Sequence, residues 1–262
     1  MHNIATLPLL IKQLGLPSIY SRWEELAETA QTQNWTYPQY LKSLCEIEVS
    51  TRYQSRVQRH LKESKLPPGK TLATFDFKSM KSINPAQIKA LSEDVGWVKR
   101  AENIIIFGPS GVGKTHIAAA IADRLITQGI RSLFISTTTL VQQLQLARQA
   151  YKLPEAINKL ARIPILILDD IGYAKKDEAE TSVLFELIAE RYETSSIIIT
   201  ANQPFSEWNN IFPDNMMAVA AIDRLVHHST IINIEQVDSY RKNQASKTAA
   251  SLAANANKIR ES

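Results

Sequence analysis

The sequence contains almost no cysteine and no long apolar run. Its single cysteine, Cys45, cannot form a disulfide within the chain. No stretch approaches the roughly 18 consecutive apolar residues that a membrane-spanning helix requires. The short apolar run at residues 7–11 has no basic segment before it, unlike a secretory signal. A disulfide-stapled or membrane-spanning protein is therefore excluded, and we expect a soluble protein of the cytoplasm with no membrane partner.

The charge balance is mildly basic and gives little guidance by itself. The net charge of +4 favours a polyanionic partner only slightly. Hydrophobic residues make up 44% of the chain, which is too apolar for a disordered protein and typical of a folded one. With 262 residues there is room for at most two folded units, since a single core rarely grows beyond about 250 to 300 residues.

Helical periodicity dominates the first 65 residues. Apolar residues recur at helical spacing over 19–30 and again over 37–61. Two prolines and a glycine at 67–69 then break the helix and indicate a linker. We predict a small all-helical N-terminal domain over residues 1–66, which would serve self-assembly or partner docking.

Beyond the linker, short apolar runs alternate with helical stretches. Five runs are candidate strands: 103–107, 132–136, 163–168, 196–200 and 230–234. They lack polar alternation, which is typical of strands covered by helices on both faces. The pattern predicts an α/β core with a five-stranded parallel sheet over residues 67–243. The basic, alanine-rich tail at 244–262 is either a solvated helix or a segment that orders on a partner.

The most specific motif is a complete Walker A sequence between the first strand and a helix expected to begin near His116. Its residues are Gly108, Pro109, Ser110, Gly111, Val112, Gly113, Lys114 and Thr115. The glycines let backbone amides approach phosphates, and the start of the helix favours an anion. Lys114 would reach the β and γ phosphates of ATP, and the Thr115 hydroxyl would coordinate Mg²⁺. We also assign His116 to the nucleotide site.

Two carboxylates and an amide follow the next buried strands. Asp169 and Asp170 end the run at 163–168, where open sheets bind ligands. Asp169 would hold Mg²⁺ through water and Asp170 would polarise the attacking water, although Asp170 could instead cap the following turn. Asn202 follows the run at 196–200 and is a candidate sensor of the γ phosphate or, alternatively, a turn residue.

Several segments of the core resemble the IstB-type transposition helper ATPases, a family related to the DnaC helicase loaders. They are residues 103–116, 165–172, 198–205 and 221–229, with shorter likenesses at 74–77 and 239–241. The resemblance spans most of residues 70–243. It implies an AAA+ ATPase that uses ATP and Mg²⁺. Its rate of ATP hydrolysis would be low unless the protein oligomerises on DNA.

The resemblance also implies an arginine finger. Arg224 matches the residue that acts in the ATP site of a neighbouring subunit, although it could instead form a salt bridge with Asp223 or another acid. Arg241 resembles a second sensor arginine, but the chain after it is too short for a full helical lid. His227 and His228 fit the family pattern, and their spacing favours a capping or surface role over a metal site.

The resemblance implies an extra helical element between the second and third strands, and we expect it to contact DNA. Residues 140–162 occupy that interval, and the loop 172–176 follows the third strand. The candidate contacts with phosphates are Arg148, Lys152, Lys159, Arg162, Tyr173, Lys175 and Lys176. The alternative is a solvated helix face and an ordinary turn.

The resemblance predicts a helper that selects targets for a transposase. A ring or spiral of identical subunits would assemble on duplex DNA without strong sequence specificity, and ATP hydrolysis would disassemble or reset it. A helicase loader that binds single-stranded DNA is the alternative. A nucleotide-gated binding protein with little turnover is a third interpretation, because Asp170 stands where many P-loop proteins have glutamate.

Overall fold

The computed structural model describes most of the chain and divides it into two compact units. The described residues are 4–80, 82–171, 177–204, 207–208 and 215–234. The units are Met1–Arg59 and His60–Ser262, so the division falls inside one long helix, ahead of the prolines and glycine at 67–69. Five predictions fall outside the described residues: those for Tyr173, Lys175, Lys176, Arg241 and the tail at 244–262.

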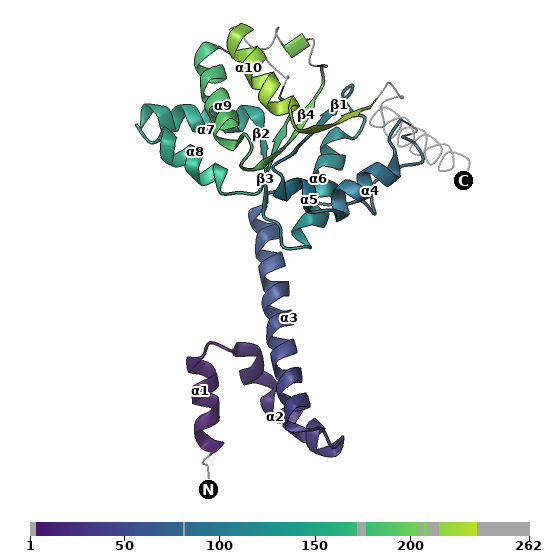
Figure 1. Ribbon diagram of the computed structural model, residues 1–262, viewed down its shortest axis with the longest axis vertical. Helices are drawn as coiled ribbons and strands as arrows, with labels where there is room; N and C mark the ends of the chain where they lie inside the picture. The colour runs from purple at the N-terminus through teal and green to yellow at the C-terminus, as the bar shows by residue number, and fades with distance from the viewer. Residues whose placement is uncertain (1–3, 81, 172–176, 205–206, 209–214, 235–262) are drawn as a thin grey trace, which may run out of the picture. The chain divides into compact units, whose positions relative to one another are not determined.

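The first unit is helical, as the apolar periodicity predicts. A short 3-10 turn, η1 (Ile4–Thr6), precedes α1 (Leu7–Gln13), α2 (Pro17–Thr32) and α3 (Tyr37–Glu63), which are drawn in purple and blue in Figure 1. Ile11, Ile19, Leu26 and Leu44 form its buried cluster. The helices predicted at 19–30 and 37–61 are confirmed, with ends up to two residues further out.

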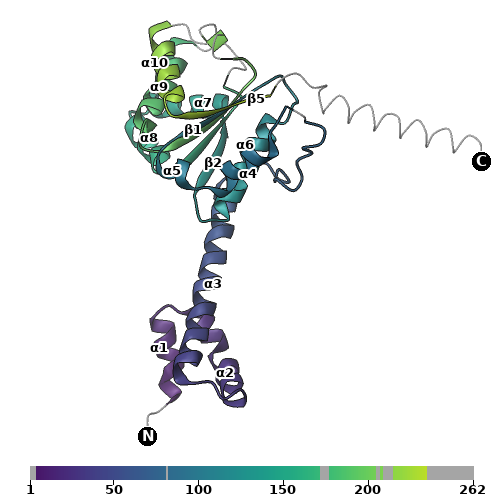
Figure 2. The ribbon, with the colours of Figure 1, turned by 45° about the vertical axis from the view of Figure 1, so that its right-hand side comes forward.

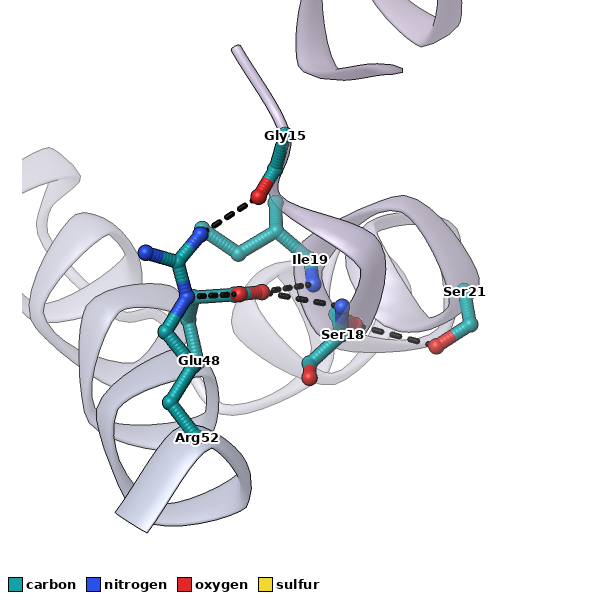
Figure 3. Close-up of polar contacts among 6 residues, drawn as sticks. All are labelled: Gly15, Ser18, Ile19, Ser21, Glu48 and Arg52. Atoms are coloured by element: carbon teal, nitrogen blue, oxygen red, sulfur yellow. Dashed lines mark hydrogen bonds and ion pairs between the residues drawn. The ribbon is translucent and has the colours of Figure 1, made fainter. Parts of the chain in front are cut away.

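A buried carboxylate fastens α2 to α3 within this unit (Figure 3). Glu48 of α3 is only 4% exposed, and its Oε2 accepts hydrogen bonds from the backbone amides of Ser18 (2.9 Å) and Ile19 (3.1 Å). Arg52 donates to the other carboxylate oxygen at 2.7 Å and also to the carbonyl of Gly15. Glu48 therefore satisfies amides at the start of α2 that no helical carbonyl can reach.

The surroundings of Glu48 favour its charged form. Burial alone raises the pKa of the carboxyl group, but the hydrogen bonds from Arg52 and from the two backbone amides lower it by more. The net pKa lies below the ordinary value of 4.5. The ionised carboxylate is thus the form that stabilises this unit.

The second unit is built on a five-stranded parallel sheet, which confirms the predicted fold class. The strands are β1 (Asn103–Phe107), β2 (Ser132–Ser136), β3 (Ile165–Asp169), β4 (Ser196–Ala201) and β5 (Ser229–Asn233), in the order β2-β3-β4-β1-β5. Two strands match their predicted bounds, and the others differ by one or two residues. β3 begins later than predicted because Pro164 has no amide hydrogen and the Ile163 amide bonds to Leu160 in the preceding turn.

Alternate residues of the strands face two different cores. Ile104 and Ile106 lie in one core with residues of α4 (Pro85–Glu93), α5 (Gly96–Lys99) and α6 (Lys114–Ile126). Ile105 and Phe107 lie in the other with residues of α7 (Thr137–Gln149), α8 (Leu153–Ala161), α9 (Glu178–Arg191) and α10 (Asn215–Val226). Figures 1 and 2 show the two helical layers on opposite faces of the sheet. A sheet covered on both faces explains the unbroken apolar runs of the sequence.

The buried side chain of Arg191 contacts the chain where β3 and β4 begin. Arg191, at the end of α9, is 1% exposed and donates to the carbonyls of Leu160 (2.7 Å), Ile163 (3.0 Å) and Ser196 (2.6 Å). Burial lowers its pKa to about 9, so the guanidinium remains charged at neutral pH. One side chain therefore links α8, α9 and the approaches to β3 and β4.

The predicted insertion at 140–162 consists of two helices, α7 and α8. Among the described residues, no helix combines the length and the apolarity that a membrane crossing needs.

Glu48→Gln tests the carboxylate that caps α2. We expect the variant to lose about 1 to 3 kcal/mol of local stability at pH 7, because its hydrogen bonds are no longer charge-assisted and Arg52 loses its partner. In the parent protein this stabilisation is present above about pH 4.5 and is lost as the pH falls through the lowered folded-state pKa. Amide hydrogen exchange of α2 in the full chain, corrected for intrinsic rates, measures it.

The matched control is Glu46→Gln, which removes an exposed carboxylate two residues away on a different face of the same helix, where it pairs with Lys42 at 3.6 Å. It is expected to change exchange by little, since exposed pairs contribute about 0 to 1 kcal/mol. Equal effects of the two substitutions would contradict the assignment to Glu48.

Candidate nucleotide-binding site

The Walker A residues form a tight loop between β1 and α6. Gly108, Gly111 and Gly113 have φ angles of 150°, 86° and 92°, which residues with a side chain rarely adopt. A Cβ on Gly108 would lie 2.6 Å from the carbonyl oxygen of Ile234, and one on Gly113 would lie 2.9 Å from the ring of Phe75. Glycine is therefore required at both places, and α6 begins at Lys114, two residues before the predicted start.

Lys114 is linked to both predicted hydrolysis residues. Its side chain is almost fully buried, and Nζ donates to the carbonyls of Gly108 and Pro109, each at 2.8 Å, and to Oδ1 of Asn202 at 2.6 Å. Asn202 in turn donates from Nδ2 to Oδ1 of Asp170 at 3.0 Å. The amide thus bridges an ammonium group and a carboxylate that lie far apart in sequence.

A second set of contacts surrounds Asp169. Its Oδ1 accepts hydrogen bonds from the hydroxyls of Thr115 (2.9 Å) and Thr200 (2.7 Å). Thr200 also accepts a bond from the backbone amide of Asp170 at 2.9 Å. Asp170 has a φ of 60°, a strained value for a residue with a side chain, and the bond from its amide holds that turn in place.

Sequence reasoning missed Thr200. It is fully buried at the end of β4, and its hydroxyl contacts both carboxylate-bearing residues of the neighbouring strand end. The available signal is a polar side chain within an otherwise apolar run, placed where a parallel strand ends. That signal also fits a satisfied core threonine, so only the register of β3 against β4 identifies the role.

A cavity of about 200 Å³ lies beside these groups, at the carboxyl ends of β1, β3 and β4. The lining residues are Lys70, Ser110, Gly111, Gly113, Lys114, Thr115, His116, Asp170 and Asn202. Larger hollows exist elsewhere, for example one of about 670 Å³ around Trp35. Size does not identify the site. Its two lysines, its glycine-rich loop, its threonine hydroxyl and its carboxylate identify it, because these groups suit a polyphosphate with a divalent cation.

The residues fit Mg²⁺. Thr115 and Asp169 supply hard oxygen donors, which this ion prefers. The Thr115 hydroxyl would coordinate the ion, and the Asp169 carboxylate, 2.9 Å from that hydroxyl, would hold it through water.

His116 faces a segment that precedes the core strands. Its Nε2 lies 2.9 Å from the carbonyl oxygen of Thr71 and 3.2 Å from the hydroxyl of Thr74, and its ring meets that of Phe75 edge to face at 5.0 Å. His116 lines the cavity as well. The residue after the Walker A motif therefore connects the cavity to the chain around Thr71.

Arg224 lies on α10 and is absent from the lining of the cavity of its own subunit. Its guanidinium group lies 4.9 Å from the ring centroid of Phe185, and Nη1 contacts the carbonyl of Ala220 at 3.4 Å. The described residues include no ion pair between Arg224 and Asp223, the alternative raised by the sequence. Asn103 fixes this end of α10 by donating to the carbonyl of Leu225 at 3.1 Å.

His227 and His228 are exposed beside Glu193. A ring nitrogen of each histidine and a carboxylate oxygen of Glu193 lie within 4.8 Å of one another. The hydroxyl of Tyr192 lies 2.8 Å from Nδ1 of His227. All three side chains of the group are solvated, consistent with the predicted surface role.

The candidate DNA contacts of the insertion are placed differently from one another. Arg148 pairs with Glu186 and donates to the hydroxyl of Ser182 at 3.1 Å, so its charge is partly neutralised within the unit. Lys152, immediately before α8, and Lys159, in the last turn of α8, are exposed. None of the three lines the nucleotide cavity.

Comparison with known proteins finds relatives described as ATP-binding proteins. The chain matches the family model for the IstB-like ATP binding protein over residues 9–248. An insertion sequence ATP-binding protein of Sinorhizobium fredii is 49% identical over 248 residues, which cover 94% of this chain and 83% of that protein. The insertion sequence IS5376 ATP-binding protein of Geobacillus stearothermophilus is 40% identical over 229 residues, covering 87% and 90%.

The fold has a counterpart among solved structures. The DnaC helicase loader superposes with a TM-score of 0.54 at 20% sequence identity, over 63% of this chain and 96% of that one. At this identity the likeness shows the AAA+ fold alone. With the family match covering nearly the whole chain, the protein belongs to the IstB-like ATP binding protein family.

Proposed function

We propose that the protein is an ATPase that assembles on duplex DNA and selects targets for the transposase of an insertion sequence. The observation that supports this proposal is that Lys114, Thr115, Asp170 and Asn202 line one small cavity, with Asp169 hydrogen-bonded to Thr115 behind it. The relatives named for insertion sequences support the transposition context.

The contacts suggest a role for each residue of the site. Lys114 would exchange the carbonyls of Gly108 and Pro109 for the β and γ phosphates of ATP. Thr115 and Asp169 would hold Mg²⁺, which supplies charge neutralisation when bound. Asp170 would then accept a proton from the attacking water.

Asn202 is suited to couple binding to hydrolysis. Because its amide contacts Lys114 on one side and Asp170 on the other, a γ phosphate that draws Lys114 away also frees the amide oxygen. The same side chain would then orient the water against Asp170. This is the role expected of a γ-phosphate sensor.

Arg224 would act in a neighbouring subunit. The cavity lining contains lysines but, among the described residues, no arginine, so a planar cation for the developing charge would come from another copy. Arg224 is half-buried on α10 and makes no ion pair with Asp223 in the described part of the chain, so its guanidinium group keeps donors for a phosphate. Hydrolysis would therefore require assembly as a ring or spiral.

Lys152 and Lys159 are the cations best placed for DNA, since both are exposed on the insertion. Repeated in each subunit, they would contact phosphates without reading sequence. Arg148 would have to leave Glu186 to join them.

Thr200→Val tests the positioning of the two aspartates. The substitution keeps the volume but removes the hydroxyl that contacts Asp169 and the Asp170 amide. We expect the Mg²⁺-dependent part of ATP affinity and the hydrolysis rate to fall roughly tenfold, the effect of one or two lost hydrogen bonds. Nucleotide titration with and without Mg²⁺ measures the first quantity.

Affinity without Mg²⁺ should change little, which separates positioning from general destabilisation. Thr194→Val serves as the control, because it removes an exposed hydroxyl whose one hydrogen bond among the described residues goes to the carbonyl of Glu190. An unchanged Mg²⁺ dependence in Thr200→Val would rule out the role given to Thr200.

DNA binding is tested with labelled duplex and single-stranded DNA of equal length, across salt, with ATP, ADP or no nucleotide. We expect duplex preference, ATP-dependent growth into large particles and a steep salt dependence. Lys152→Gln with Lys159→Gln should reduce the salt slope by roughly 0.9 for each lost phosphate contact, whereas the exposed Lys99→Gln should not. Preference for single-stranded DNA would favour a helicase loader. Binding that is insensitive to salt and nucleotide would rule out the proposed function on DNA.

A further inference from the structure

A short segment before the core strands lies against the Walker A loop. We call residues 69–77 the strap. The carbonyl of Thr71 and the hydroxyl of Thr74 both contact Nε2 of His116, at 2.9 Å and 3.2 Å. These contacts join the strap to the first turn of α6, one residue after the Walker A threonine.

The strap is also braced internally and by packing. The hydroxyl of Thr74 donates to the carbonyl of Gly69 at 2.7 Å, which closes the turn that contains Lys70. The ring of Phe75 lies so close to Gly113 that a Cβ there would meet it at 2.9 Å. The position of Lys70 is therefore set from both sides, by Thr74 within the strap and by Phe75 against the phosphate loop.

Lys70 is the strap's contribution to the nucleotide cavity. It is half-buried and lines the cavity together with Lys114, Asp170 and Asn202. Within the described residues, no acid forms an ion pair with Lys70. Lys114, by contrast, already has three oxygen partners. A lysine without an acidic partner beside an anion site is a natural ligand for phosphate.

We propose that Lys70 is a second lysine for the terminal phosphate of ATP, presented to the cavity by the strap. The inference rests on the proposed ATP site. Lys70 is matched with the terminal phosphate because it shares the cavity with Asp170 and Asn202. The proposed function places these two residues at the bond that is hydrolysed. Phosphate binding and strap position are then coupled, since His116 holds the strap and follows directly after the phosphate-binding residues.

The test is Lys70→Met in the full chain, with affinities for ATP and ADP measured by calorimetry in the presence of Mg²⁺. Methionine keeps the unbranched chain and removes the charge. We expect ATP affinity to fall roughly tenfold, the effect of one charge-assisted hydrogen bond, and ADP affinity to fall less than about twofold. Lys70→Arg should restore most of the preference for ATP, because it retains the cation.

Lys78→Met is the matched control, since Lys78 is exposed just beyond the strap and does not line the cavity. Equal losses for ATP and ADP, or no loss for either, would overturn the role of Lys70. Lys114→Ala separates this failure from that of the ATP site itself. If the parent protein bound no ATP, or if Lys114→Ala bound it as well as the parent, the proposed function would fail first.

Discussion

The hydrogen bonds among Lys114, Asn202 and Asp170 are the constraint on which the rest of the site depends. A buried ammonium group must be surrounded by oxygen atoms, and here a backbone turn and one amide provide them. The same amide orients the carboxylate of Asp170. Because these side chains follow three different strands, the site exists only when β1, β3 and β4 are in register. Folding of the parallel sheet and assembly of the site are therefore one event.

Contacts at the other end of the strands, where they begin, hold them in that register. Arg191 joins the residue Ile163 before β3 to Ser196, the first residue of β4. Asn103 joins β1 to β4 by accepting from the Ile197 amide at 2.9 Å, and it also donates to the end of α10. The helix that carries Arg224 is thus fixed by the strand that leads into the Walker A loop. The cavity at the ends of the strands and the helix that carries Arg224 are therefore connected through β1.

The sequence predicts the sheet and the Walker A loop well because both follow from local patterns. Apolar runs mark β1 and β2 to the residue, and glycine spacing identifies the loop that needs positive φ angles. Thr200, Arg191 and Lys70 could not be assigned, because their partners lie on other elements and no local pattern fixes strand register. The pairing of Arg148 with Glu186 on α9 was equally out of reach of the sequence, because the two residues lie on different helices.

The central claim is that ATP held by one subunit is hydrolysed with Arg224 of another. Its most direct test is the rate of ATP hydrolysis on duplex DNA when Lys114→Ala and Arg224→Ala proteins are mixed. Each variant alone should be nearly inactive, since one lacks the phosphate-binding lysine and the other the finger. The mixture should recover a substantial fraction of parent activity at interfaces that combine an intact cavity with an intact Arg224. Absence of recovery in mixed assemblies, or full activity of Arg224→Ala alone, would contradict the account.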